Sequence, residues 1–343
     1  MKSERIDHFA DLASGRLLVV GDVMLDCTIR GTVKRVSPEA PVPVLESTYT
    51  VYGAGGAANV AANARQLGAA VDVVGIVGAD AEGERLRRIL VEHEIDDAGI
   101  FTDPSRPTTM KTRIVAQNQQ IIRVDRESRD AVERKAARRM LRYAEERLRD
   151  VDIVVVSDYA KGALTRSATV ALIERARRLG VPVLVDPKGS APAKYAGASV
   201  LTPNRQEVVR LAGLDADEAD DPDVIRAASR KLLADLECDA VLVTHGAEGM
   251  TLFEQDEVTT IPAVVREAYD STGAGDTVAA VLALALASGR RIADAARLAG
   301  IAAGVVVAKA GTATVTAAEL TDAYDAWVQG VGARSPQAVH VEQ

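Results

Sequence analysis

The feature that most constrains the fold of this chain is a regular alternation of short apolar runs with longer amphipathic segments. The apolar runs occupy residues 16–21, 71–77, 153–157, 181–186, 200–202 and 240–244. The segments between them have helical spacing and occupy residues 57–67, 82–93, 132–149, 167–179 and 223–236. Buried strands separated by helices predict an α/β fold, in which a parallel sheet is covered by helices on both faces.

Polar residues come at the ends of four of these runs. Asp22, Asp158 and Asp186 each end or directly follow a run, and Asn204 comes shortly after another. Ligands of open α/β sheets bind outside the carboxyl ends of the strands. We therefore expect a binding site at that edge of the sheet.

Two regions, 28–52 and 107–125, have the alternating side chains of hairpins and break the strand–helix pattern. Prolines in the first region are typical of loops and edge strands. Together the hairpins predict a small sheet that stands off the main one as a lid, which phosphotransferases use to exclude water. The alternative is two independent surface hairpins.

Composition narrows the functional class. With 41 basic and 49 acidic residues the net charge is -8, which argues against a nucleic-acid-binding protein. The first 15 residues lack the apolar core of a signal peptide, and the longest apolar run, 277–288, is too short to span a bilayer. Cys27 and Cys238 lie far apart, and the histidines have no ligand spacing. We therefore expect reduced thiols, no histidine-bound metal and a cytoplasmic protein.

A glycine-rich turn precedes the apolar run at 277–288 and predicts the start of a buried helix. The backbone N–H groups of Gly273, Ala274 and Gly275 would point outward there and attract an anion. Asp276 would repel a bound phosphate, but it is well placed to take a proton from a hydroxyl that attacks phosphorus. The alternative is that Asp276 only caps the helix.

A second glycine loop, residues 53–59, contains the spacing of a dinucleotide-binding fingerprint. That motif should follow the first buried strand, whereas this loop follows a lid strand, so a dehydrogenase is disfavoured. The sequence also has no P-loop. We interpret Gly55, Gly56 and Asn59 as a place where a sugar approaches the backbone. The alternative, tight helix–sheet packing, explains the glycines but not the asparagine.

Two further segments are candidates for nucleotide and metal binding. Asn204 and Glu207 have the spacing of a helix capping box, and they would equally suit the water shell of Mg²⁺. Residues 244–249 predict a turn between two strands. Either this is only a hairpin turn, or the backbone at Thr244, Gly246 and Gly249 binds a nucleotide phosphate.

The turn DSTGAGDT (270–277), taken with the loop at 53–59, resembles the signature of the ribokinase-like (PfkB) sugar kinases over about residues 14–320. The resemblance implies a three-layer α/β/α sandwich with a mostly parallel central sheet and a β-sheet lid. It implies one kinase domain over 1–330, followed by a flexible tail over 331–343. Asp276 would be the catalytic base, residues 273–275 the anion hole, and ATP and Mg²⁺ the cofactors.

Within that family the chain is similar to the kinases of D-glycero-β-D-manno-heptose 7-phosphate. The matching strings are GDVMLD (21–26), SPEAPVP (37–43), QNQQ (117–120), SDYAKGA (157–163), DPKG (186–189) and GVVV (304–307). The implied reaction moves the γ-phosphate of ATP to the anomeric O1, which gives the 1,7-bisphosphate. The residues expected to bind this substrate are Asp22, Asp26, Gly55, Gly56, Asn59, Lys111, Arg113, Arg123, Lys161 and Lys188. A solvated lid charge is the alternative for each of the lid cations.

Two departures from the pattern matter. The resembling enzymes are bifunctional, and this chain ends too early for their adenylyltransferase half, so only the kinase step is expected. Gly300 stands where relatives often have an asparagine near the adenine.

Two alternatives remain, namely a PfkB kinase for another sugar or nucleoside, and a nucleotide-binding regulatory module without turnover. Because exposed sheet edges tend to pair, we also expect a homodimer formed through the lid.

Overall fold

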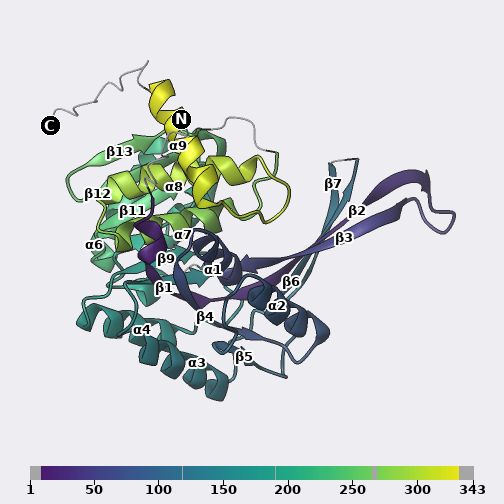
Figure 1. The fold of residues 1–343 in the computed structure, drawn as a ribbon, viewed down its shortest axis with the longest axis horizontal. Coiled ribbons are helices and arrows are strands. Elements are labelled where there is room, and N and C mark those ends of the chain that lie inside the picture. The colour runs from purple at the N-terminus through teal and green to yellow at the C-terminus, as the bar shows by residue number, and fades with distance from the viewer. Residues whose placement is uncertain (1–8, 118, 190, 265–268, 332–343) are drawn as a thin grey trace, which may run out of the picture.

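A nine-stranded central sheet carries the fold (Figure 1). The computed structural model describes residues 9–117, 119–189, 191–264 and 269–331. The strands of this sheet are β1 (Arg16–Gly21), β4 (Ala70–Val77), β5 (Ile100–Thr102), β8 (Ile153–Asp158), β9 (Val183–Pro187), β10 (Val200–Leu201), β11 (Ala240–Thr244), β12 (Met250–Glu254) and β13 (Val258–Ile261). Their spatial order is β13-β12-β11-β10-β9-β8-β1-β4-β5, and the two antiparallel pairings are those of β12 with β11 and with β13. The predicted mostly parallel sheet is confirmed.

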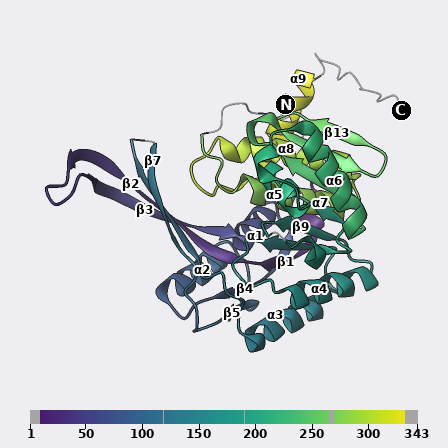
Figure 2. The same cartoon turned by 180° about the vertical axis from the view of Figure 1, so that it is seen from behind.

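Helices cover both faces of this sheet (Figures 1 and 2). Alternate residues of β1 explain why: Leu17 and Val19 belong to one apolar core, and Leu18 and Val20 to the other. The first core includes residues of α1 (Ala57–Gln66), α2 (Ala81–Glu92), α7 (Ala274–Ala287), α8 (Ile292–Val307) and α9 (Ala317–Val331). The second includes residues of α3 (Arg134–Arg147), α4 (Arg166–Arg178), α5 (Arg205–Leu211) and α6 (Pro222–Leu236). The three-layer α/β/α sandwich is therefore confirmed.

A separate four-stranded sheet projects from the body as an arm (Figure 1). Its order is β3-β2-β6-β7, with β2 (Val23–Val36), β3 (Pro43–Gly56), β6 (Met110–Ala116) and β7 (Gln119–Arg126). Because β2 pairs in parallel with β6, the two predicted hairpins form one lid rather than two independent surface features. The lid is longer than expected, because β2 already begins at Val23 and so contains Asp26.

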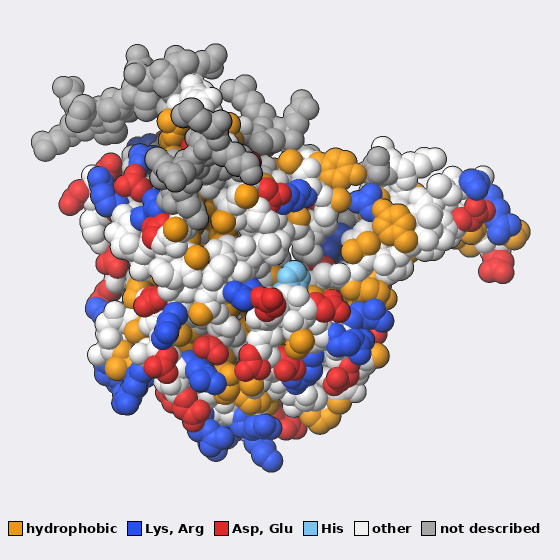
Figure 3. Space-filling model, in the orientation of Figure 1, with side chains coloured by type: hydrophobic (Ala, Val, Ile, Leu, Met, Phe, Trp, Pro, Cys, Tyr) orange, Lys and Arg blue, Asp and Glu red, His pale blue; other side chains and the backbone are white. Residues whose placement is uncertain are grey.

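The two faces of the lid differ in chemistry. The register places Asp26, Lys111 and Asp125 in one row across the strands, with Arg113 and Arg123 in the next row of the same face. The opposite face carries the row Ile29, Ile114 and Ile122, and Val124 lies in the row beside it. Figure 3 shows hydrophobic side chains exposed on the projecting arm. The lid thus has one charged face and one apolar face.

Two remaining expectations concern the ends of the chain and membranes. Residues 332–343 of the expected tail lie outside the described residues. In the part of the chain that the structure describes, none of the helices has the length and apolar character needed to cross a bilayer.

Candidate active site

The site lies where the sheet changes direction. From β1 the chain builds β4 and β5 on one side, and β8 to β11 on the other. Parallel strands whose connections diverge in this way leave a crevice at their carboxyl ends. Asp22 follows β1 at this crevice, and Tyr159 follows β8. The expected position of the site is therefore where the polar strand ends meet.

Asp22 holds the turn that follows β8. Its carboxylate accepts hydrogen bonds from the backbone N–H groups of Tyr159 (2.9 Å), Lys161 (3.0 Å) and Ala163 (3.1 Å). Asp22 is buried, and burial raises its pKa although these three donors oppose the shift. The structure thus gives Asp22 a positioning task, and its expected sugar contact stays a prediction.

The glycine-rich turn opens α7 as predicted. Gly273 precedes the helix with φ +80°, and a Cβ there would lie 2.6 Å from Asn59 Nδ2, so a side chain is excluded at this position. The Ala274 N–H donates to the Ser271 carbonyl at 3.3 Å, so one of the expected anion-hole amides is engaged within the turn. Beside Gly275 a Cβ would meet no atom within 4 Å, which leaves open space at the start of the helix.

Asp276 is buried at this helix start, with 2% of its surface exposed. Its Oδ2 accepts a hydrogen bond from Asn59 Nδ2 at 2.8 Å, and its Oδ1 accepts one from the Tyr159 hydroxyl at 2.7 Å. Burial, reinforced by the nearby charge of Asp186, raises the pKa of Asp276 to about 7. A carboxylate with a pKa near neutrality is suited to accept a proton at physiological pH.

A buried polar network fixes Asn59. The Asn63 amide donates to the Asn59 carbonyl at 2.9 Å and to its Oδ1 at 3.3 Å, and the Thr277 hydroxyl donates to Asn63 Oδ1 at 3.0 Å. These contacts join α1 to α7. Since the Asn59 oxygen is already an acceptor in this network, its amide nitrogen is the atom turned to Asp276.

The second glycine loop borders the same place. Gly56 has φ +57°, and a Cβ there would lie 2.4 Å from the Asp22 carbonyl oxygen, so only glycine fits. A Cβ on Gly55 would lie 2.7 Å from Asp26 Oδ2. The loop therefore brings its backbone against both acids, as close helix–sheet packing and sugar approach would each require.

Four of the five expected cationic side chains are paired with acids. The ion pairs are Arg113–Asp26 (2.7 Å), Arg123–Asp125 (2.9 Å), Lys161–Glu127 (2.6 Å) and Lys188–Glu207 (2.9 Å). Lys111 has no ion-pair partner among the residues that the structure describes, and burial lowers its pKa. Its ammonium lies 5.0 Å from the centre of the Tyr159 ring. Lys111 is thus the expected cation with its charge still available to an incoming anion.

The expected metal and nucleotide residues meet at the ends of β10 and β11. Asn204 and Glu207 form the capping box, with bonds of 2.8 and 2.9 Å, and Asn204 bridges to Thr244 on the neighbouring strand. The second oxygen of Glu207 binds Lys188. Burial acts to lower the pKa of Lys188, but the charges of Asp186 and Glu207 outweigh it and raise that pKa.

Residues 244–249 form the expected turn between antiparallel strands, β11 and β12. Gly246 and Gly249 both have positive φ, and a Cβ on Gly246 would face open space. Gly300, in α8, packs so that a Cβ would lie 3.0 Å from the Met250 side chain. The turn itself is confirmed. That its backbone binds a nucleotide phosphate stays a prediction.

Sequence reasoning missed two residues of this site. Tyr159 was only part of a matching string, although an aromatic residue with a hydroxyl directly after a buried strand was the signal available. Asp186 was noted as a strand end, but not as an acid beside Asp276. Its Oδ2 is buried and has no hydrogen-bond partner within the described residues. This oxygen lies 4.0 Å from the Lys188 ammonium, and a carboxylate oxygen without a hydrogen bond beside Glu207 suits a hard cation such as Mg²⁺.

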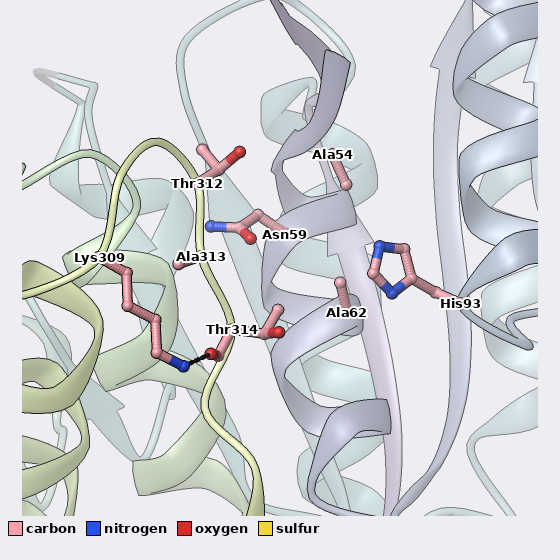
Figure 4. A pocket seen from close by; sticks show the side chains of 8 residues that line it. All are labelled: Ala54, Asn59, Ala62, His93, Lys309, Thr312, Ala313 and Thr314. Carbon is pink, nitrogen blue, oxygen red and sulfur yellow. Dashed lines mark hydrogen bonds between the residues drawn. The ribbon is translucent and has the colours of Figure 1, made fainter. Parts of the chain in front are cut away.

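A cavity of about 320 Å³ adjoins the site (Figure 4). It lies between the loop at 309–314 and α1, and Asn59 and Thr312 line it with His93 on the far side of Ala62. Lys309 on its wall donates to the Thr314 carbonyl at 2.8 Å and pairs with Glu319 at 2.7 Å. Asn59, which binds Asp276, is therefore also in contact with this cavity on the side of the 309–314 loop.

The sequence profile of the pfkB family carbohydrate kinases matches residues 14–318. The chain belongs to this family. It is accordingly an enzyme of the carbohydrate kinase class. The family assignment agrees with the glycine-rich turn and with the lid that the structure shows.

Individual relatives agree with the family assignment. The bifunctional protein HldE of Geobacter sulfurreducens is 47% identical over 91% of this chain, and that of Geotalea uraniireducens is 45% identical over 89%. The chain spans 62–63% of the length of these two relatives. Among solved structures, Arabidopsis thaliana ribokinase complexed with ribose and ATP has a TM-score of 0.71 at 22% identity, covering 90% of this chain and 98% of its own. Escherichia coli phosphofructokinase-2 in complex with potassium has a TM-score of 0.73 at 19% identity. The match covers 92% of this chain and 99% of that structure's chain. These structures establish the ribokinase-like fold.

Proposed function

We propose that this pfkB kinase transfers the γ-phosphate of ATP to the anomeric O1 of D-glycero-β-D-manno-heptose 7-phosphate. The observation that carries the proposal is Asp276, a buried carboxylate with a pKa near 7 at the start of α7, beside open space at Gly275. The similarity to the HldE proteins and the matching strings support the heptose substrate.

The reaction follows from these groups. Asp276 takes the proton of the sugar hydroxyl while that oxygen forms a bond to the γ-phosphorus, and the bond from phosphorus to the bridging oxygen breaks to release ADP. Each carboxylate oxygen has two lone-pair directions, so Asp276 can accept this hydrogen bond while Asn59 and Tyr159 keep theirs. The free backbone N–H groups at the helix start would stabilise charge on the transferred phosphoryl group.

The charged face of the lid supports a phosphorylated acceptor. Lys111 is the unpaired one of the expected substrate-binding cations on this face, among the residues that the structure describes, and Arg113 and Arg123 lie in the adjacent row. An arginine can exchange a carboxylate for a phosphate with the same bidentate geometry. We therefore assign the 7-phosphate to Lys111 first and to the arginines second.

Mg²⁺ would bind through Asp186 and Glu207, partly through water, and its charge would neutralise the nucleotide phosphates. Lys188 lies between these acids and pairs with Glu207, so its ammonium would have to exchange that partner to bind the same phosphates. The turn at residues 244–249 would contact the nucleotide from the neighbouring strand end.

The apolar face of the lid supports a homodimer. Ile122 is 53% exposed and Val124 is 52% exposed on this face. Neighbouring exposed apolar residues on a projecting sheet are typical of an association surface. We propose that a second copy covers this face.

The test is ADP release with heptose 7-phosphate, compared with unphosphorylated heptose, fructose 6-phosphate and ribose, followed by ³¹P NMR to locate the new phosphate. Asp276→Asn should lose about 10²- to 10⁴-fold in kcat, which is the usual contribution of a general base. Asp294→Asn, at an exposed acid of α8 paired with Arg297, is the matched control and should keep full activity. Preference for another sugar would refute the substrate, and full turnover by Asp276→Asn would refute the mechanism.

A further inference from the structure

Tyr159 lies in a turn whose backbone is fixed by several contacts. Three N–H groups of its turn donate to the single carboxylate of Asp22. Ala160 and Gly162 in the same turn both have positive φ, and a Cβ on Gly162 would lie 1.9 Å from the Asp130 carbonyl oxygen. The direction in which the Tyr159 side chain leaves the sheet is therefore set by the fold and not by the substrate.

The Tyr159 side chain extends from the turn after β8 to Asp276 at the start of α7. Its hydroxyl lies 2.7 Å from Oδ1, while Asn59 lies 2.8 Å from Oδ2, so the carboxylate is held by one donor on each oxygen. One donor comes from the turn after β8 and the other from α1. Two donors on opposite oxygens define the plane of the carboxylate, and with it the direction from which a sugar hydroxyl is accepted.

The surroundings keep Tyr159 a donor. Burial, together with the negative charges of Asp276 and Asp186, raises the pKa of its phenol well above the ordinary value. The ring also lies within 5.0 Å of the Lys111 ammonium and 5.4 Å of the Lys188 ammonium. A tyrosine in this setting stays protonated over the working pH range and cannot replace Asp276 as the base.

We propose that Tyr159 is a positioning residue for the base: its hydroxyl holds the Asp276 carboxylate in the orientation that receives the sugar proton. Asp22 acts through it by fixing the turn. This inference rests on the proposed role of Asp276 in phosphoryl transfer. It extends that role to a residue that itself makes no bond to the transferred group.

A shift in the pH profile should report this contact. The groups that face Asp276 are Asn59 from α1, Tyr159 from the turn after β8, and Asp186 and Lys188 from the end of β9. Asp186 raises the pKa of Asp276, whereas Asn59, Tyr159 and Lys188 lower it. Removing the tyrosine hydroxyl takes away one stabilising bond to the ionised form, so the pKa of Asp276 should rise.

The experiment compares Tyr159→Phe with Tyr195→Phe. Tyr195 is a fully buried tyrosine, whereas Tyr159 is half-buried; the Tyr195 hydroxyl also donates to a buried carboxylate, that of Asp158, at 2.7 Å, but it makes no contact with Asp276. For Tyr159→Phe, we expect the acidic limb of kcat/KM to move up by about 0.5–1 pH unit, the equivalent of one net hydrogen bond. We also expect kcat on the plateau to fall about tenfold, with the KM for the nucleotide unchanged. Tyr195→Phe should leave the limb in place.

A second measurement needs no activity. In protein labelled with ¹³C at the aspartate carboxyls, the resonance absent from Asp276→Asn belongs to Asp276, and its titration midpoint should rise in Tyr159→Phe only. An unchanged midpoint together with an unchanged acidic limb would overturn the positioning role. If the wild-type chain phosphorylates none of the sugars, the proposed function fails, and the carboxyl titration still decides whether Tyr159 controls Asp276.

Discussion

Asp276→Asn should make this protein more stable at pH 8 while removing its activity. The folded state raises the pKa of Asp276 from 3.8 to about 7. Below pH 3.8 this carboxyl is protonated in both the folded and the unfolded state, so it does not lower the free energy of unfolding. Between pH 3.8 and about 7 the unfolded chain ionises while the folded one retains the proton, so stability falls as the pH rises. The full shift corresponds to a loss of ~4 kcal/mol above pH 7.

The substitution removes this linkage because the amide does not titrate. The network survives it, since the new amide oxygen can accept from Asn59 and the new amide N–H can donate to the Tyr159 hydroxyl, which rotates to accept. We expect the variant to gain about 2–4 kcal/mol in the free energy of unfolding at pH 8, and less than about 1.5 kcal/mol at pH 5. Urea unfolding followed by circular dichroism at both pH values measures the difference.

The sign of the result separates the two interpretations of this residue. If Asp276 only capped α7, its loss would cost about 0.5–2 kcal/mol and would leave catalysis untouched. Asp294→Asn is again the control, because an exposed ion pair is worth at most about 1 kcal/mol and should show no such dependence on pH. A variant of Asp276 that is less stable at pH 8, or whose gain is the same at pH 5 and pH 8, would refute the reasoning.

Three other perturbations test the remaining parts of the site. Lys111→Met should raise the KM for the sugar phosphate at least about tenfold, from the loss of a charged hydrogen bond, and hardly change activity on the unphosphorylated sugar; an equal effect on both would contradict the phosphate assignment. Gly273→Ala should cost about 1–3 kcal/mol in urea unfolding, because its φ is +80° and its Cβ would strike Asn59, so wild-type stability would disprove the close approach. Ile122→Asp should convert a dimer to a monomer in light scattering, with Val258→Asp on β13 as the exposed control; a monomeric wild type would refute the lid interface.

The layers of the fold are predictable because their causes are local. Buried parallel strands read as continuous apolar runs, and each run ends at a polar residue where the chain leaves the core. The strand ends at Asp22, Asp158 and Asp186 therefore indicated the edge of the sheet at which Asp22, Tyr159 and Asp276 meet. The same local character marked the turn at Gly273 and the helix that it opens.

The lid shows where local reasoning ends. Its central pairing, β2 with β6, joins residues about 85 positions apart, with Asp26 beside Lys111. Nothing in the sequence near Gly21 and Asp22 shows that the chain changes sheets there and continues as a new strand at Val23. From the sequence alone Asp26 therefore looks like a residue of the loop after the first strand, although it belongs to the charged row of the lid.

The site itself depends on contacts of long range that no spacing encodes. Asp22 binds a turn 137 to 141 residues away, and Tyr159 binds an acid 117 residues away. An acid at the end of a strand looks the same in sequence whether it faces a substrate or the amides of a neighbouring turn. The residue types could be predicted, but the partner of each could be found only once the sheet order was known.

The arrangement divides chemistry from substrate choice. Asp276, Tyr159, Asp186 and Lys188 stand on the helix start and strand ends of the central sandwich. Tyr159 is hydrogen-bonded to Asp276, and Lys188 is ion-paired with Asp186. Lys111 and the arginines that would recognise the acceptor stand on the lid, a second sheet joined to the first directly after Asp22. Changes to the charged face of the lid can therefore alter which sugar is bound without moving the base. This separation is a physical reason why one fold can carry kinases for different sugars.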